Sequence, residues 1–335
     1  MRRRRLGNTD IEVSELGFGA WGIGGRTAGP TSYGDTDDQV SLRALSSAVA
    51  NGITFFDTSN VYGDGHSEVL LGQAFRPCRS AVVIATKVGW PSYAGPSDFS
   101  AKSMRKSLEG SLRRLQSDYV DVLQLHNPPL NWVQTQPEIL ATLQDFVAEG
   151  KVRALGVSVR SPAEAATLIG CGALAGVQAN FNMMDIRMVS SGLLQNLAAH
   201  TQSLIVRTPL CFGFLSGSID STTVFSDGDH RSAWPVGQRT LWAEGARMVS
   251  EMAERYGAGP LYVAALRFCL SFQGVASILS GMMNEGEVVK NVAAVNKGPL
   301  PQSFTDEVLD LHIRAKFFVV GTAEQQSENS QLAKV

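Results

Sequence analysis

Residues 119–157, YVDVLQLHNPPLNWVQTQPEILATLQDFVAEGKVRALGV, hold one complete strand–helix–strand unit. Short apolar runs open and close the stretch, as expected of buried strands. Between them, Ile139, Leu143 and Val147 lie on one helical face, and Gly150 ends the pattern. Two neighbouring parallel strands require a long, usually helical crossover, so this stretch predicts a βαβ unit.

The same rhythm extends along the chain in both directions. The run at residues 81–85 does not alternate, which is typical of a parallel strand buried on both faces. The predicted strands are residues 15–21, 53–56, 81–85, 119–125, 152–157, 177–180, 204–207 and 276–279. Each is followed by a helix or by a segment long enough to hold one, so we expect an α/β fold of the (β/α)8 TIM-barrel type.

Other segments lie outside this repeat. Residues 6–12 predict an N-terminal β-hairpin, and residues 209–239, rich in Gly, Ser, Asp and Thr, predict a long loop after the seventh strand. Residues 304–318 predict an extra C-terminal helix. No linker divides the chain, so we expect a single barrel domain over residues 1–320 and a flexible tail over residues 321–335.

Composition limits the classes of function. Hydrophobic residues make up 44% of the 335 residues and the net charge is −2, which fits a protein with a sizeable core and no global attraction for nucleic acid or anionic membranes. No stretch approaches the ~18 apolar residues of a membrane span. The arginines at residues 2–5 are followed by no apolar segment, so we interpret them as a solvated first strand and not as a secretory signal.

Cysteine and histidine spacing indicates neither disulfides nor metal. The four cysteines are far apart and form no C-x-x-C pair, which favours reduced thiols in the cytoplasm. The five histidines lack ligand spacing, so we expect no metal site.

Polar residues follow three successive predicted strands. Asp57, Lys87 and His126 stand at the ends of the second, third and fourth strands, and Tyr62 lies in the loop after the second. Active sites of such barrels form at these C-terminal strand ends. Singly, a lysine could extend to solvent and a histidine could be a satisfied core residue. Their convergence on one face instead favours a catalytic site.

These residue types suit proton transfer to a developing alkoxide. A tyrosine hydroxyl has an unperturbed pKa of about 10, and a nearby ammonium lowers it. We therefore expect Lys87 to lower the pKa of Tyr62, and Asp57 to pair with Lys87 and hold it. His126 would orient a carbonyl oxygen by a hydrogen bond.

The motifs around these residues resemble those of the aldo-keto reductases. The resemblance runs from about residue 6 to about residue 300, in order and at suitable spacing. The segments that carry it are GFGAWGIGG (17–25), FFDTSNVYGDGHSEVLLG (55–72), ATKVG (85–89), SLRRLQSDYVDVLQLHNP (111–128), EGKVRALGVS (149–158), TPLCFGFLSG (208–217) and SGMMNEGEVVKN (280–291). The last segment is similar to the L-galactose dehydrogenase and potassium-channel β-subunit branch.

The resemblance implies a catalytic tetrad of Asp57, Tyr62, Lys87 and His126. It also implies an NAD(P)H cofactor laid across the C-terminal face without a Rossmann fold. Cofactor contacts would come from Gly19, Ala20, Trp21, Asp57, Ser158, Gln178, Arg207, Pro209, Leu210, Gly213, Leu215, Gly281, Met283, Glu287 and Asn291. Among these, the resemblance implies that Ser158 and Gln178 bind the carboxamide. It implies that residues 209–217 wrap the pyrophosphate, and that Glu287 and Asn291 lie nearest the adenine. The substrate would contact Trp21, Trp90 and Asn127.

Three positions depart from the family's pattern. Val159 follows Ser158 where an asparagine is usual, and Arg207 stands where an aromatic residue often stacks on the nicotinamide. Met283 replaces the Lys or Arg that grips a 2′-phosphate in many members. Because a phosphate needs charge-assisted donors, we expect NADH to be used at least comparably to NADPH.

The expected function is hydride transfer between a nicotinamide cofactor and a ketone, aldehyde or sugar. One alternative is a barrel aldolase that uses Lys87 as a Schiff-base amine, although a neighbouring Asp57 should favour its charged form. Another is a redox-sensing NAD(P)-binding regulatory subunit. The expected partner is a small carbonyl or sugar substrate, with no nucleic acid or membrane, and a homo-oligomer is left open.

Overall fold

The computed structural model describes residues 1–27, 32–226 and 228–319. Its strands are β1 (Arg3–Arg5), β2 (Glu12–Ser14), β3 (Leu16–Gly19), β4 (Phe55–Asp57), β5 (Val83–Val88), β6 (Val120–His126), β7 (Val152–Ser158), β8 (Leu174–Asn180), β9 (Ser203–Arg207) and β10 (Val275–Gly281). Its α-helices are α1 (Asp38–Ala50), α2 (His66–Phe75), α3 (Ala101–Leu115), α4 (Trp132–Thr135), α5 (Pro137–Ala148), α6 (Pro162–Ala166), α7 (Arg187–Ser190), α8 (Leu193–Ala199), α9 (Val236–Arg255), α10 (Leu261–Leu270), α11 (Glu285–Asn296) and α12 (Gln302–Arg314). Short 3₁₀ turns are η1 (Gly22–Gly24), η2 (Tyr62–Gly65), η3 (Arg76–Ala81), η4 (Cys211–Ser216) and η5 (His230–Ala233).

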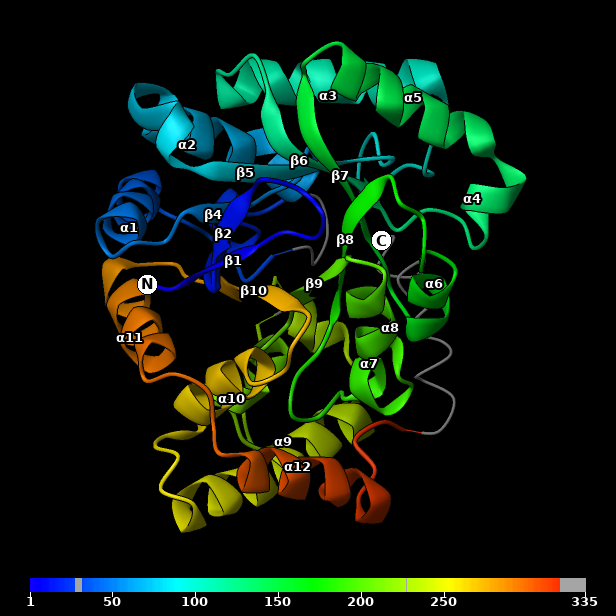
Figure 1. Cartoon of the computed structure of the whole chain (residues 1–335). Coiled ribbons are helices and arrows are strands. Elements are labelled where there is room, and N and C mark those ends of the chain that lie inside the picture. Colours follow the sequence, from blue (N-terminus) through cyan, green and yellow to red (C-terminus); the bar gives the residue numbers. More distant parts are fainter. Residues whose placement is uncertain (28–31, 227, 320–335) are drawn as a thin grey trace.

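Strands β3 to β10 form a closed parallel barrel in the order β10-β3-β4-β5-β6-β7-β8-β9 (Figure 1). Helices surround it, and each of the eight predicted strands overlaps one of its strands. The predicted (β/α)8 barrel is therefore confirmed. Because all strands run the same way, the residues that end them meet at one face of the molecule.

The N-terminal end of the barrel is closed by the hairpin β1–β2, which lies in front of the barrel in Figure 1. Leu6, Ile11 and Val13 of the hairpin are fully or almost fully buried. They pack on residues that point into the barrel, namely Phe55, Ala85, Val122, Ala154, Ala175, Ile205, Ala276 and Leu279. This small core fills the N-terminal half of the barrel interior, so polar groups can occupy the C-terminal face.

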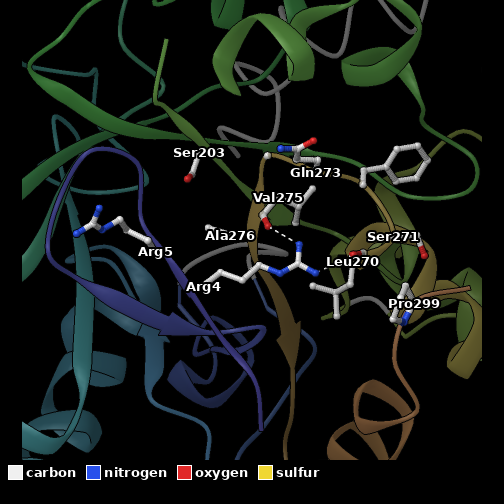
Figure 2. Close-up of a pocket in the computed structure, with 11 residues that line it drawn as sticks. Arg4, Arg5, Ser203, Leu270, Ser271, Gln273, Val275, Ala276 and Pro299 are labelled. Carbon is white, nitrogen blue, oxygen red and sulfur yellow. Dashed lines mark hydrogen bonds between the residues drawn. The ribbon is translucent and has the colours of Figure 1, made fainter. Parts of the chain in front are cut away.

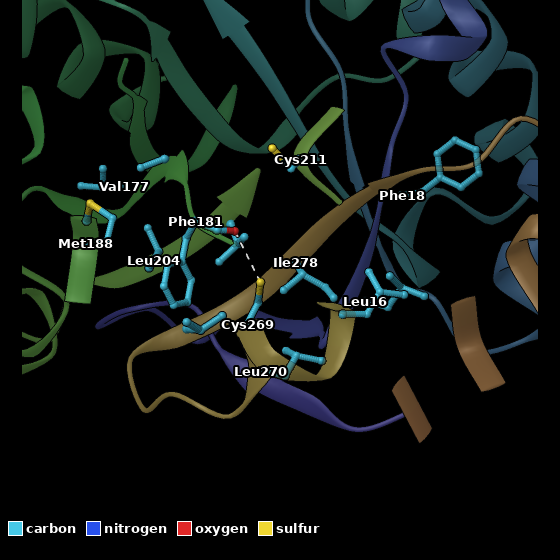
Figure 3. Close-up of a cluster of buried hydrophobic side chains, with 14 of the residues drawn as sticks. Leu16, Phe18, Val177, Phe181, Met188, Leu204, Cys211, Cys269, Leu270 and Ile278 are labelled. Carbon is cyan, nitrogen blue, oxygen red and sulfur yellow. Dashed lines mark hydrogen bonds between the residues drawn. The ribbon is translucent and has the colours of Figure 1, made fainter. Parts of the chain in front are cut away.

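A larger core lies between the strands and the surrounding helices (Figure 3). Leu204 of β9 and Ile278 of β10 pack there with residues of α10, and the Cys269 thiol donates a hydrogen bond of 3.4 Å to the Phe181 carbonyl. All four cysteines are free thiols, as their spacing predicts.

Helix boundaries differ from the predictions where local geometry intervenes. The helix expected at residues 189–200 is split into α7 and α8 because Gly192 adopts a left-handed conformation, φ 73°. The loop expected over residues 209–239 ends earlier, since α9 begins at Val236. The helix expected over residues 304–318 ends at Arg314, and the following Phe317 is buried with its carbonyl bound by Gln238.

The arginine-rich first strand is not simply solvated, which corrects the interpretation above. Arg4 and Arg2 both bind the carboxylate of Glu15, a residue only 3% exposed, and Arg4 also donates to the carbonyls of Leu270 and Val275. Within the described residues, every helix is too short or too polar to cross a bilayer. The predicted tail, residues 321–335, lies outside the described residues.

Candidate active site

An ion pair lies at the centre of the C-terminal face. Asp57 ends β4 and pairs with Ala85 of β5. Lys87 lies two residues after Ala85, as the next-to-last residue of β5. Lys87 Nζ lies 2.5 Å from Asp57 Oδ1 and 2.8 Å from the Thr58 carbonyl, and the lysine has no exposed surface. A lysine is rarely buried in this way unless it is paired, and both of its partners come from the end of β4.

Two amide side chains complete the hydrogen bonding of Asp57. Gln124 Nε2 and Gln178 Nε2 each donate to Asp57 Oδ2 at 2.8 Å, and Gln178 Nε2 also lies 3.2 Å from Gln124 Oε1. Ser158 Oγ in turn donates to Gln178 Oε1 at 3.3 Å. Gln178, expected to bind the cofactor's carboxamide, therefore directs its amide nitrogen to Asp57.

Gln124 was missed by sequence reasoning. Its partner position across the β5–β6 ladder is Lys87, so the two side chains point to the same face of the sheet. The buried polar residue in an apolar strand, VDVLQLH, was the signal that could have found it.

Tyr62 is held at the rim by a close approach of two backbones. It begins η2, where Gly63 has φ 60°, and a Cβ on Gly63 would lie 2.1 Å from the Gly24 carbonyl oxygen. Only glycine fits at that contact. The tyrosine ring lies 4.7 Å from Lys87 Nζ and 6.2 Å from the His126 ring, measured to the ring centroids.

His126 ends β6 and is braced by Trp90, whose Nε1 donates to the His126 carbonyl at 2.6 Å. Burial lowers the pKa of His126 well below its usual value, and the charges of Lys87, Arg207 and Arg160 lower it further. The imidazole is therefore neutral at pH 7, and it keeps one N–H for a hydrogen bond.

Burial also reverses one expected pKa shift. The pKa of Tyr62 is raised, first by burial and then by Asp57, while Arg207 opposes the rise. The net fall expected for the pKa of Tyr62 is therefore wrong for this structure, because burial and Asp57, which both disfavour the phenolate, outweigh the nearby cations. The pKa of Lys87 is itself lowered by burial, against the opposing effect of Asp57.

Aromatic residues contact one another beside these groups. The Trp21 ring contacts Tyr33 and His230 edge-on, each at 4.8 Å between centroids, and Trp21 also hydrogen-bonds Tyr93. Burial raises the pKa of Tyr33 to about 12 and lowers that of His230 to about 4, so both rings are neutral. Tyr33, Tyr93 and His230 come from loops whose conformation the sequence could not give.

The loop after β9, expected to wrap the cofactor's pyrophosphate, is conformationally strained. Thr208, Cys211 and Phe212 all have positive φ, of 55°, 44° and 54°. Such a concentration of left-handed non-glycine residues costs energy and is typical of functional loops. Of the predicted contacts, Gly213 lies part-exposed in this loop, whereas Leu215 is fully buried. Pro209 is buried and Leu210 part-exposed.

The residues expected at the adenosine end lie at the end of β10 and the start of α11. Glu287 accepts hydrogen bonds from the Met283 backbone nitrogen at 2.7 Å and from Asn284 Nδ2 at 3.1 Å. Asn291 Nδ2 donates to Ser280 Oγ at 3.1 Å. The exposed Gly281 has open space beside it.

The predicted cofactor contacts differ in how accessible they are. Gly19 ends β3 and is part-exposed, but Ala20 has no exposed surface, donates from its backbone to the Asp57 carbonyl, and accepts from Ser67. A side-chain contact from Ala20 therefore has little support.

Unpartnered buried atoms fit a bound nicotinamide cofactor. Asn127 Oδ1 and the Nε atoms of Arg160 and Arg207 are buried without a hydrogen-bond partner among the described residues. Buried polar atoms are normally paired, so these three mark places where ligand groups can complete the hydrogen bonding. Asn127 Oδ1 can accept from a carboxamide N–H, and the two guanidinium Nε atoms are donors for an acceptor group of a ligand.

A cavity of about 490 Å³ lies at the other end of the barrel, between Arg4 and the start of β10 (Figure 2). Its central guanidinium, Arg4, already binds Glu15 and two carbonyls, including that of Val275. The cavity contains none of the tetrad, and its Arg4 side chain is engaged in fixing the hairpin.

The sequence profile of the aldo/keto reductase family matches residues 15–312. The chain belongs to the aldo/keto reductase family, and it is thus an NAD(P)H-dependent oxidoreductase of the carbonyl/alcohol class. This confirms the predicted family and the predicted nicotinamide cofactor.

Individual relatives cover most of the chain. Aldo-keto reductase YhdN of Bacillus subtilis is 30% identical over 86% of this chain and 87% of its own length. The NADH-specific methylglyoxal reductase of Escherichia coli is 30% identical, over 88% and 94%. The structure of glycerol dehydrogenase AKR11B4 from Gluconobacter oxydans matches with a TM-score of 0.78 and 28% identity, over 95% and 97%. Potassium-channel β subunits and L-galactose dehydrogenase are also among the relatives, as the predicted branch requires.

Proposed function

We propose that this protein reduces a small aldehyde or ketone with a bound nicotinamide cofactor, and that Tyr62 donates the proton. The observation that carries the proposal is the proximity of four residues at the C-terminal face. Lys87 is hydrogen-bonded to Asp57, and the centroid of the Tyr62 ring lies 4.7 Å from Lys87 Nζ and 6.2 Å from that of His126. When bound, the cofactor supplies the hydride that adds to the carbonyl carbon.

The residues of the chain handle the oxygen of the carbonyl. Neutral His126 donates its N–H to the carbonyl oxygen and orients it. As negative charge develops on that oxygen, the protonated hydroxyl of Tyr62 transfers its proton there. The phenolate left behind is stabilised by the ammonium of Lys87, whose position Asp57 fixes. The products are the alcohol and the oxidised cofactor.

The proposed substrate pocket is the space framed by Trp21, Trp90 and Asn127, to which Tyr93 is added. The similarity to a methylglyoxal reductase and to a glycerol dehydrogenase supports a small polar substrate of a few carbons. Ser158, Gln178 and the loop over residues 208–217 are proposed to hold the cofactor. Free thiols support a cytoplasmic location, and a single domain over residues 1–320 is proposed.

The aldolase alternative is disfavoured by geometry. Lys87 has no exposed surface, and its amine already donates to Asp57 and Thr58. The lowered pKa of Lys87 would by itself favour a free amine, but the amine is fully buried, so the side chains that cover it would have to move before a carbonyl carbon could reach it. A regulatory role like that of the related channel β subunits is distinguished by turnover of a defined substrate.

Tyr62→Phe tests the proposal. Positioned acid catalysis contributes about 10²–10⁴-fold, so we expect the variant to lose at least about 99% of kcat while the Kd for NADH changes less than about threefold. Steady-state reduction of methylglyoxal and cofactor titration by fluorescence quenching give both numbers. A variant that retains half of its activity would remove Tyr62 from the role of proton donor.

A further inference from the structure

Two arginines beside the proposed active site form no ion pair with any residue that the structure describes. Arg160 follows β7 and Arg207 ends β9, the strands on either side of β8. Arg207 Nη2 reaches across to the Val159 carbonyl at 2.9 Å, which brings its guanidinium to the residue before Arg160. Both side chains are part-exposed at the C-terminal face.

Neither guanidinium has its hydrogen-bonding capacity satisfied. Among the described residues both Nε atoms are buried without a hydrogen-bond partner, and the Arg160 guanidinium lies 5.8 Å from the centroid of the Trp90 ring. Elsewhere in the described chain, part-buried arginines such as Arg79, Arg187 and Arg231 bind a carboxylate at 2.5–2.7 Å. The nearest carboxylate to Arg160, Glu164, is instead bonded to the backbone nitrogens of Arg160 and Ser161.

The charge balance of the site is therefore positive. Lys87 is matched by Asp57, whereas the carboxylates near Arg160 and Arg207 in the described part of the chain are the more distant Glu164 and Asp57. Their charges reach His126, the residue proposed to orient the substrate's carbonyl. A nicotinamide ring brings no negative charge, and its oxidised form is a cation. Binding of the ring therefore does not neutralise the excess positive charge of Arg160 and Arg207.

We propose that Arg160 and Arg207 form an anion site within the substrate pocket, and that the physiological substrate is a carbonyl or alcohol compound carrying a carboxylate or phosphate group. Planar guanidiniums bind both groups with paired, charge-assisted hydrogen bonds. Arg160 lies on the Trp90 side, where the substrate is expected. This inference rests on the proposed function for the identity of the reaction, but the anion site is testable without turnover.

The kinetic test compares pairs of substrates that differ in charge, the first of which is also isosteric. 4-Carboxybenzaldehyde is paired with 4-formylbenzamide, and glyceraldehyde 3-phosphate with glyceraldehyde, which separates a carboxylate site from a phosphate site. Hydrogen bonds to charged groups correspond to about ten- to hundredfold in affinity. We expect the wild type to favour the anionic member of one pair at least about tenfold in kcat/KM, and Arg160→Gln and Arg207→Gln to lose most of that preference. Arg160→Lys, which keeps the charge but not the planar fork, should retain part of it.

Arg247→Gln serves as the matched control, because Arg247 is an exposed residue of α9 paired with Glu251 on the same helix. It should keep the wild-type preference. If the preference survives in both Arg160→Gln and Arg207→Gln, the proposal is overturned. It is also overturned if these variants weaken the Kd for NADH about tenfold and leave the preference intact, since the pair would then serve the cofactor's pyrophosphate.

Calorimetric titration of benzoate, benzamide and inorganic phosphate into the NADH-loaded protein tests the site independently of turnover. Benzoate or phosphate should bind more tightly than benzamide, and Arg160→Gln should remove the difference. Equal binding of all three would overturn the anion site. If anion binding depends on the arginines but no carbonyl is reduced, the anion site stands and the proposed function fails.

Discussion

At the residue scale, the chemistry depends on the protonation state that burial gives to Tyr62. A raised pKa keeps the hydroxyl protonated throughout the neutral range. Such a phenol gives up its proton only to a strong base, and a developing alkoxide is one. The resting site is therefore prepared for reduction, whereas alcohol oxidation needs the phenolate.

This difference predicts opposite pH profiles for the two directions. Reduction should be nearly independent of pH between about 6 and 9, because Tyr62 stays protonated and His126, with its lowered pKa, stays neutral. Oxidation should rise about tenfold per pH unit over the same range, since the phenolate fraction rises in that proportion. Initial rates of both directions in a constant-ionic-strength buffer measure this. An oxidation rate that levels off below pH 8 would contradict the raised pKa.

The identities of the tetrad could be predicted from the sequence, but their hydrogen bonds could not. Strand ends place Asp57, Lys87 and His126 on one face whatever the side-chain conformations are. The amides of Gln124 and Gln178 meet Asp57 only because the barrel closes with a particular register. The upward shift of the Tyr62 pKa likewise depends on burial, a property of the packed molecule.

At the element scale, two loops together position the catalytic tyrosine. η1 and η2 come from different βα units, and their backbones touch at Gly24 and Gly63. This contact explains why glycine stands at both positions, which belong to motifs about forty residues apart in the sequence. Apolar runs identified the strands, but this loop–loop contact has no periodic signal.

Gly63→Ala should separate the two loops and displace Tyr62. The added Cβ would lie 2.1 Å from the Gly24 carbonyl, so the backbone must move. Because a misplacement of about 1 Å can cost about 10²-fold in rate, we expect kcat to fall by roughly that factor. Gly192→Ala is the control, with a similar φ of 73° but open space around its Cβ and a position between α7 and α8. It should lose stability and keep kcat, and equal kcat losses in both variants would count against the loop contact.

The start of α11 governs the expected choice of cofactor. Met283 offers no charge to a 2′-phosphate, while Glu287 and Glu285 place two carboxylates in the first turn. The nearby cation is Arg43 of α1, which lies 3.5 Å from Glu285 and is partly neutralised by it. We therefore predict that NADH binds at least as tightly as NADPH, measured by fluorescence quenching at fixed ionic strength. A Kd for NADPH a hundredfold below that for NADH would refute this prediction. If that preference for NADPH then disappeared in Arg43→Gln, Arg43 would be the residue that binds the phosphate.

At the scale of the whole molecule, the two ends of the barrel have different tasks. The C-terminal face holds strained loops, unpartnered polar atoms and buried charges. The N-terminal end is filled by apolar residues of the hairpin and fixed by satisfied ion pairs. Barrels of this kind separate stability from chemistry in the same way.

The hairpin anchor gives this separation a direct test in Glu15→Gln. Glu15 is 3% exposed and accepts from both Arg2 and Arg4, and Arg4 continues to the carbonyls of Leu270 and Val275. Removing the carboxylate charge leaves Arg4 part-buried and less well paired, which typically costs about 1–3 kcal/mol. Urea unfolding should show a loss of unfolding free energy toward the lower end of this range, because Arg2 is half exposed and solvent screens its ion pair.

The same substitution should leave kcat and KM within about twofold of the wild type, because additive behaviour is the rule for sites that share no partners. Arg3→Gln, a change on an exposed residue of the same strand, is the control and should alter neither stability nor activity. A large kcat loss in Glu15→Gln, in protein that remains folded by circular dichroism, would mean that strain passes from the hairpin through the barrel to the tetrad. Unchanged stability would instead mean that the ion pairs add nothing to the stability of the hairpin, which is then held by the packing of Leu6, Ile11 and Val13.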